Sequence, residues 1–208
     1  NINGSLSDKD LRFDESFLKS DKIDVRFNGN IFNYKTKKRS LDLKILTNNT
    51  DINTIAEIFP KEIKVPLNPF VKILKHNING RANTDLAIKG YYKKPELFGN
   101  VNFNNLSIVN HSPDIPKGSG NIDFLGKSLM LDIKAYPDKD GMILVSGPVA
   151  PVLKTLNLDV NSDYIDLEKS QKVLLAISDL FVFKLGPIPD MNIKGKGKVN
   201  LNISGKFK

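Results

Sequence analysis

Apolar and polar residues alternate one by one along most of this chain. In the segment TDLAIK, at 84–89, Leu86 and Ile88 would lie on one side, and Asp85 and Lys89 on the other. Successive side chains of an extended strand point to opposite faces, so this spacing predicts strands with one apolar and one polar face. The same alternation recurs at 22–27, 101–104, 121–124, 129–134, 156–161 and 199–204. In MILV, at 142–145, both sides are apolar, and the pattern does not assign an inward side.

Turns rich in glycine and asparagine are predicted between these runs. Short alternating strands joined by such turns are typical of an antiparallel sheet with one wet face and one apolar face. The predicted fold class is therefore mostly β. The turns are expected at Asn28–Asn30, Phe98–Asn100, Leu125–Lys127, Asp138–Gly141 and Ser146–Pro148.

Two segments break the alternation and predict short amphipathic helices. Residues 51–59 follow polar capping residues, carry apolar side chains at 52, 55, 58 and 59, and stop before Pro60. Residues 166–180, DLEKSQKVLLAISDL, begin with an acidic turn and continue with a cluster of aliphatic side chains. Each helix is expected to cover the apolar face of the neighbouring sheet.

A repeat divides the chain. Residues 192–205, NIKGKGKVNLNISG, align without a gap on residues 77–90, NINGRANTDLAIKG. Repetition at a long period is typical of elongated, stacked architectures. We therefore expect one continuous elongated domain of repeat units at 1–76, with the helix near 51–59, at 77–191, with the helix near 166–180, and at 192–208, where a further unit begins. The chain is interpreted as a piece of a longer protein.

The composition narrows the class of partner. The chain has 208 residues, a net charge of +8 and no cysteine, so disulfides and thiolate metal sites are excluded. Most lysines are scattered singly through the strands, where they keep sheets soluble and edges unpaired, and one cluster stands at Lys35–Arg39. No recognition helix, stacking-aromatic motif or arginine-rich arm accompanies the charge, and no nucleic-acid partner is predicted.

No catalytic, cofactor or metal site is predicted. The two histidines, His76 and His111, stand far apart in the sequence, without metal-ligand spacing. Asp138–Gly141 lacks the later ligands of a calcium loop, and Gly195–Gly197 precedes a strand instead of opening a helix, as a phosphate loop would. The chain is therefore predicted not to be an enzyme.

The second repeat unit resembles a known family. Its order of glycines, prolines and alternating strands is similar to the repeating unit of the TamB and AsmA-like proteins of diderm bacteria. The resemblance covers residues 77–208 best. It rests on Gly80, Leu86, Ile88, Gly90, Pro95, Gly99, Val101 and Phe103, followed by Ile115–Pro116, Gly120–Phe124, Leu129–Leu131 and Gly141–Gly147.

The resemblance implies an elongated, curved antiparallel sheet, a half-pipe or β-taco, whose groove is lined by aliphatic side chains. It implies a periplasmic location, in a parent protein anchored to the inner membrane, and transport of phospholipid between the inner and outer membranes. It further implies an Omp85-family outer-membrane barrel as a partner of another part of the parent chain. The residues expected to line the groove are Leu86, Ile88, Val101, Phe103, Ile122, Phe124, Leu129, Leu131, Ile133, Leu156, Leu158, Val160, Leu201 and Ile203.

Two other functions stay open at this point. A scaffold could assist the assembly of outer-membrane or secreted proteins by adding their strands to its open sheet edges. A structural spacer could use the same aliphatic side chains as a closed core that needs no ligand. Free sheet edges also predict that the isolated chain can pair into a homodimer through an edge strand.

Overall fold

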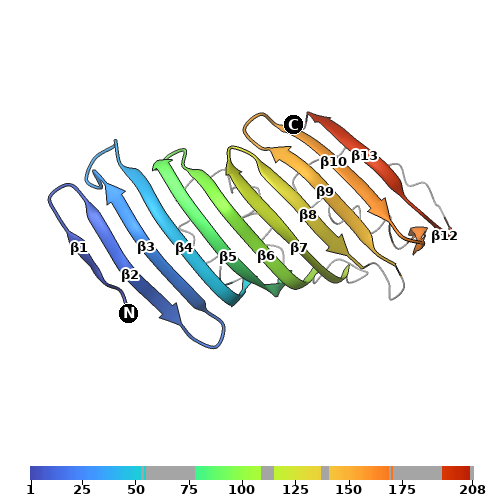
Figure 1. Ribbon diagram of the computed structural model, residues 1–208, viewed down its shortest axis with the longest axis horizontal. Coiled ribbons are helices and arrows are strands. Elements are labelled where there is room, and N and C mark those ends of the chain that lie inside the picture. The colour runs from blue at the N-terminus through green and yellow to red at the C-terminus, as the bar shows by residue number, and fades with distance from the viewer. Residues whose placement is uncertain are drawn as a thin grey trace.

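One long antiparallel sheet dominates the computed structural model of the chain (Figure 1). The structure describes residues 1–52, 54, 78–108, 115–136, 141–168, 170 and 194–206. The strands are β1 (Gly4–Leu6), β2 (Leu11–Lys19), β3 (Asp24–Phe32), β4 (Ser40–Asp51), β5 (Ile78–Tyr91), β6 (Glu96–Ile108), β7 (Ile115–Gly126), β8 (Leu129–Ala135), β9 (Ile143–Ala150), β10 (Thr155–Ser162), β11 (Ile165–Asp166), β12 (Lys196–Gly197) and β13 (Asn200–Lys206).

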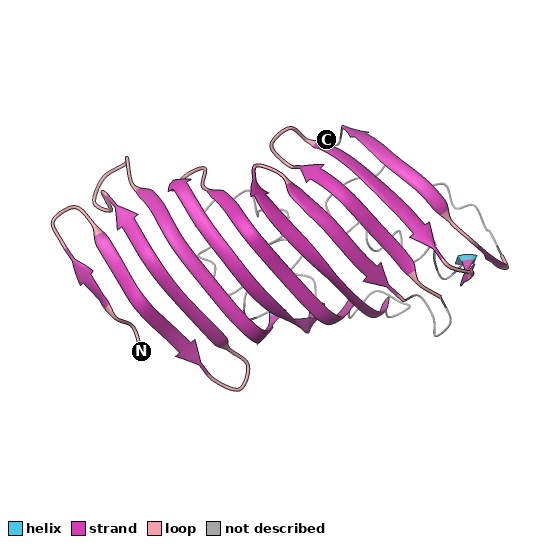
Figure 2. Ribbon diagram, in the orientation of Figure 1, coloured by secondary structure: helices cyan, strands magenta, loops and turns pink. Residues whose placement is uncertain are grey.

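The sheet is a meander of 11 strands in the order β1 to β10, followed by β13. Every pair in it is antiparallel, as the alternating arrows show (Figure 2). Strands β11 and β12 form a separate pair. The sheet does not close, because β1 and β13 lie at its opposite ends. The prediction of a mostly β, open antiparallel sheet is confirmed.

β-Bulges interrupt the regular pairing of several strands between β2 and β7. The register shifts between Thr47 and Thr50 in β4 and between Phe103 and Leu106 in β6, with further shifts in β2 and β5. Asn49 and Asn105 stand inside two of these bulges with φ of 46° and 53°. Asparagine tolerates this left-handed conformation better than most residues, and a bulge increases local twist and bending. The bulges therefore contribute to the curvature of the sheet.

Three of the predicted turns are wrong. Gly29, Gly99 and Gly147 lie inside β3, β6 and β9, with φ between 110° and 138°. A Cβ atom on Gly99 would stand 1.9 Å from the carbonyl oxygen of Asp85 on β5. These glycines allow close approach of two strands, so they mark the middle of a strand instead of its end.

Another predicted turn is present. The backbone N–H of Leu125 donates to the carbonyl of Ser128 over 2.9 Å, which closes the connection between β7 and β8 around Gly126. The turn predicted at Asp138–Gly141 lies outside the described residues, apart from Gly141.

Only the beginnings of the two predicted helices are described. Ile52 and Thr54 are helical, and the Asp51 carboxylate accepts a hydrogen bond from the N–H of Thr54, as a capping residue does. Leu167, Glu168 and Ser170 are helical as well. The rest of 51–59 and of 166–180 lies outside the described residues.

The sheet continues across the boundary expected between residues 76 and 77. Strands β4 and β5, on the two sides of that boundary, pair from Ser40 opposite Tyr91 to Asp51 opposite Arg81. The two aligned segments occupy different places. The first forms β5 in the middle of the sheet, and the second forms β12 and β13, with β13 at one end.

Candidate functional site: the apolar face of the sheet

The predicted groove-lining residues lie on a single face of the sheet, which we call the apolar face. Partners that stand directly opposite each other in an antiparallel sheet share a face. One row of such partners runs from Thr84 through Val101 and Ile122 to Leu131. Another runs from Val160 on β10 to Leu201 on β13. The alternation in the sequence therefore assigned inward and outward sides correctly on these strands.

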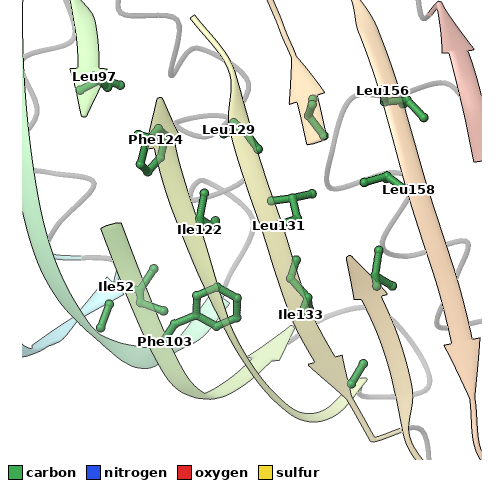
Figure 3. Packing of buried hydrophobic residues seen from close by; sticks show 14 of the residues in the cluster. Ile52, Leu97, Phe103, Ile122, Phe124, Leu129, Leu131, Ile133, Leu156 and Leu158 are labelled. Atoms are coloured by element: carbon green, nitrogen blue, oxygen red, sulfur yellow. The ribbon is translucent and has the colours of Figure 1, made fainter. Parts of the chain in front are cut away.

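Most of these side chains are buried in one cluster (Figure 3). The cluster includes Leu86, Ile88, Phe103, Ile122, Phe124, Leu129, Leu131, Ile133, Leu156, Leu158 and Val160. Val101 and Ile203 are partly buried against it, whereas the side chain of Leu201 is 47% exposed. The middle of the apolar face is thus shielded from water in the single chain, and its β13 end is accessible.

The cluster also contains residues that were not predicted. Ile143 and Val145 belong to it, which resolves the ambiguous segment at 142–145, since Ile133 on β8 stands opposite Val145. The alternation in the segment LDLKIL, at 41–46, predicts a strand with Leu41 on its apolar side, so the position of Leu41 could have been found from the sequence. Ile52 lies in the helix that is expected to cover the apolar face, and its burial in the cluster agrees with that expectation. The remaining unpredicted members are Ala82, Leu97, Ala135, Val149 and Ile165.

A glycine on the neighbouring strand stands opposite each phenylalanine of the apolar face on β6 and β7. Phe103 stands opposite Gly120, and a Cβ on that glycine would be 2.8 Å from the Phe103 ring. Phe124 on β7 stands opposite Gly99 on β6. A missing side chain on one strand therefore makes room for a large ring on its neighbour, which keeps the packed surface continuous.

One buried polar pair interrupts this face between β4 and β5. The hydroxyl of Thr84 donates to the hydroxyl of Thr47 over 3.0 Å, and the backbone N–H of Thr84 donates to the same oxygen. The Thr47 hydroxyl in turn donates to the carbonyl of Ala82 over 3.4 Å. Because these groups satisfy one another, the pair can remain buried without a ligand.

The apolar face is less covered toward β2, β3 and β4. Phe13, Phe27 and Ile45 are only half-buried, although they lie in line with buried residues of β5. Leu18, also on this face, is exposed. Both ends of the face therefore present apolar side chains to solvent, where further apolar atoms could pack.

The opposite face of the sheet is polar. Asn83, Asn102, Asn121 and Asp132 stand side by side on β5, β6, β7 and β8. Lys44 forms an ion pair with Asp85 on this face, at 3.3 Å and half-exposed. Such a pair contributes little to stability, so the face is best described as the solvated side of the sheet.

The described residues include no cluster of metal ligands and no helix that could cross a membrane. Within them, no three or more His, Asp or Glu side chains gather in a way that could hold a metal ion. None of their helices is long and apolar enough to cross a membrane. His76 and His111 lie outside the described residues.

Comparison with protein-family models, with curated proteins and with solved structures found no match to this chain. The resemblance to the TamB and AsmA-like repeat consequently rests on the residues quoted for it above.

Proposed function

We propose that this chain is a periplasmic segment of a TamB/AsmA-like bridge protein that binds phospholipid acyl chains on its apolar face. The observation that supports this most is an open sheet with one apolar face, which the Thr47–Thr84 pair interrupts between β4 and β5 and whose ends remain partly uncovered. Acyl chains are a ligand for such a surface, because burial of each methylene contributes about 0.8 kcal/mol. A row of similar side chains would let an acyl chain move along it without one deep binding site.

The exposed ends of the face are the expected entry points for lipid. Residues in its centre, such as Ile88, are about 2% exposed, so a lipid that reached them would have to displace the atoms that cover them. Leu201 on β13 is exposed, and Ile203 on β13 and Phe27 and Ile45 near the other end are only partly buried, so a lipid there would displace fewer atoms. Charge substitution at Ile88 would therefore test the fold, and Leu201 is the better site at which to test lipid binding.

Replacing Leu201 by Asp is expected to reduce the phospholipid that co-purifies with the protein at least tenfold. A carboxylate at this position would be desolvated by an acyl chain, at a cost of several kcal/mol. Native mass spectrometry, followed by lipid extraction, measures the bound phospholipid.

Ser204→Asp is the matched control, because Ser204 is exposed and lies on the polar face of the same strand, opposite Asn157. The control should retain its lipid. If both variants kept the wild-type lipid load, or if the wild-type protein carried none and took up none, acyl-chain binding on this face would be refuted.

A second candidate function is supported by the edge of β13 that faces away from β10, which no other described strand covers. The segment aligned with it in the repeat forms β5, which pairs with β4 on one side and β6 on the other. Among the described residues, β13 pairs only with β10. A scaffold that adds a strand of an outer-membrane or secreted protein, or of a second copy of this chain, would use such an edge.

Proline substitution can separate this scaffold function from lipid binding. The carbonyl of Val199 accepts from the N–H of Ser162, so the backbone of Val199 faces β10. In an antiparallel ladder this direction alternates, which places the N–H of Ile203 toward β10 and that of Ser204 toward the free edge. Ser204→Pro is therefore expected to abolish edge pairing without breaking the contact with β10.

Analytical ultracentrifugation of Ser204→Pro and wild type would measure edge pairing, with lipid load as the second readout. Scaffold function predicts lost association and unchanged lipid in the variant. Association that survives Ser204→Pro would exclude the β13 edge as the pairing site.

A further inference from the structure

Alternate connections of the meander lie along one long edge of the sheet, which we call the basic rim. Because the strands are antiparallel, every second connection returns to the same side, along the upper edge in Figure 1. The basic rim is formed by the connections at 7–10, 33–39, 92–95, 127–128 and 151–154, together with the end of β13.

Basic side chains outnumber acidic ones on this rim. The acidic residues are Asp8, Asp10 and Glu96, and the Asp10 carboxylate accepts the N–H of Asn33. One ion pair occurs there in the described part of the chain, between Lys127 and Glu96 at 3.6 Å. The basic residues are Lys9, Lys35, Lys37, Lys38, Arg39, Lys93, Lys94, Lys127, Lys154 and Lys206.

The opposite rim differs in charge pattern. Its described residues carry both signs in close succession, as at Asp21 and Lys22 between β2 and β3, and at Asp51 and Arg81 on paired strands. Among the described residues, the charges of the basic rim would therefore attract an anionic surface more strongly than those of the opposite rim.

Tyrosines hold the centre of the basic rim in a fixed arrangement. The Arg39 guanidinium lies 4.2 Å from the centre of the Tyr92 ring, and the N–H of Tyr92 donates to the Arg39 carbonyl. The hydroxyl of Tyr91 donates to the carbonyl of Lys37 over 3.0 Å. These contacts join the connections at 33–39 and 92–95, so their cations form one cluster. The Nε of Arg39 is buried there without a hydrogen-bond partner.

Apolar side chains project from the same rim. Leu153 and Val152, in the connection between β9 and β10, are 70% and 57% exposed, and Leu125 beside the connection between β7 and β8 is 56% exposed. The tip with Leu153 stands four strands from the connection at 92–95, which corresponds to about 20 Å along the sheet. A flat surface could therefore meet the cations and the aliphatic tips together.

We propose that the basic rim docks the protein on the surface of an anionic phospholipid bilayer. The lysines and Arg39 face the lipid phosphates, and Val152 and Leu153 enter the boundary between headgroups and acyl chains. Cations combined with exposed aliphatic side chains are the usual composition of a membrane-surface contact. A nucleic acid would use the cations but would leave the aliphatic tips without a role. The docking site does not require that the apolar face bind acyl chains.

The sequence alone did not indicate this site. It shows one cluster, Lys35–Arg39, and scattered lysines, whose spacing indicates a solvated surface. Pairing of β4 with β5 brings Tyr91 opposite Ser40, and so places Lys93 and Lys94 beside that cluster. Convergence of distant loops depends on the strand order, which the alternation pattern does not specify.

Flotation with lipid vesicles tests the docking site in the full chain. The probe is a vesicle of about three parts phosphatidylcholine to one part phosphatidylglycerol, a content that gives it a negative surface potential. Each lysine near such a surface contributes about fivefold to binding. Lys37→Glu with Lys94→Glu is therefore expected to lower the partition coefficient about 20-fold or more. Val152→Ser with Leu153→Ser should lower the binding that persists at high salt.

The matched control is Lys19→Glu with Lys22→Glu, which makes the same change in net charge at the opposite rim. The control should bind within about twofold of the wild type, apart from long-range electrostatics. Equal losses in the two charge variants would overturn the docking site in favour of a net-charge effect. Vesicles that bind no better with phosphatidylglycerol than without it, or cations of the rim that bind duplex DNA but not vesicles, would also overturn it.

Acyl-chain loading of each variant, measured by native mass spectrometry, distinguishes the two proposals. Loss of vesicle docking with an unchanged lipid load would show that the basic rim binds the vesicle surface independently of acyl-chain binding on the apolar face. A wild-type protein that docks on vesicles but carries no lipid would refute the proposed function and leave the docking site intact.

Discussion

Leu131→Asp is expected to unfold the protein or to lower its free energy of unfolding by about 5 kcal/mol. The side chain of Leu131 is 2% exposed in the middle of the apolar face, between Ile122 on β7 and Gly147 on β9. The substitution removes packed methyl groups and places a carboxylate among the apolar side chains of the cluster. Urea denaturation followed by circular dichroism measures the change.

Met130→Asp provides the matched comparison for this prediction. Met130 precedes Leu131 on the same strand, but its side chain lies on the polar face and is 39% exposed. The cost there should stay below about 1 kcal/mol, as for most exposed substitutions. If Leu131→Asp and Met130→Asp lowered the free energy of unfolding by similar amounts, the two faces of β8 would not differ in burial as described.

Gly99→Ala is expected to destabilise the protein by about 3 kcal/mol, although it adds a single methyl group. Gly99 has φ of 110°, a conformation that residues with a side chain rarely adopt. The new Cβ would also stand 1.9 Å from the carbonyl oxygen of Asp85, so β5 and β6 would have to separate. Thermal and urea denaturation would both report the loss.

Comparison with Gly205→Ala separates the cost of backbone strain from the cost of the clash with the Asp85 carbonyl. Gly205 also has a positive φ, 144°, but nothing lies within 4 Å of the position that its Cβ would take. Its cost should reflect backbone strain alone, about 1 kcal/mol. If Gly99→Ala lowered the free energy of unfolding by no more than Gly205→Ala does, the close approach of β5 and β6 would be contradicted.

The alternation of side chains predicted the strands and their inward faces, because the direction of a side chain is a local property of an extended backbone. Leu86, Ile88, Ile122 and Leu131 are all where the pattern placed them. Glycine and asparagine residues predicted the ends of the strands less well. A glycine next to asparagine is favoured both in a hairpin turn and where two strands come close, and Gly99 belongs to the second class.

Properties that depend on strand order could not be predicted from the sequence. The burial of Leu86 and the exposure of Leu201 follow from their places in the middle and at the end of the sheet, although the two residues occupy equivalent positions in the repeat. The cluster around Arg39 and Tyr92 depends on the pairing of β4 with β5. Sequence alternation carries no information on such long-range neighbours.

The apolar face as a lipid-binding surface is tested most directly by site-specific photo-crosslinking in cells. A photoreactive phenylalanine analogue would replace Leu201 or Phe27 on the apolar face, and Ser204 or Arg26 on the polar face, one position at a time. Acyl-chain binding predicts phospholipid adducts at Leu201 and Phe27 and none at Ser204 and Arg26, detected by mass spectrometry after purification. Adducts at all four positions, or at none, would contradict a lipid-binding apolar face.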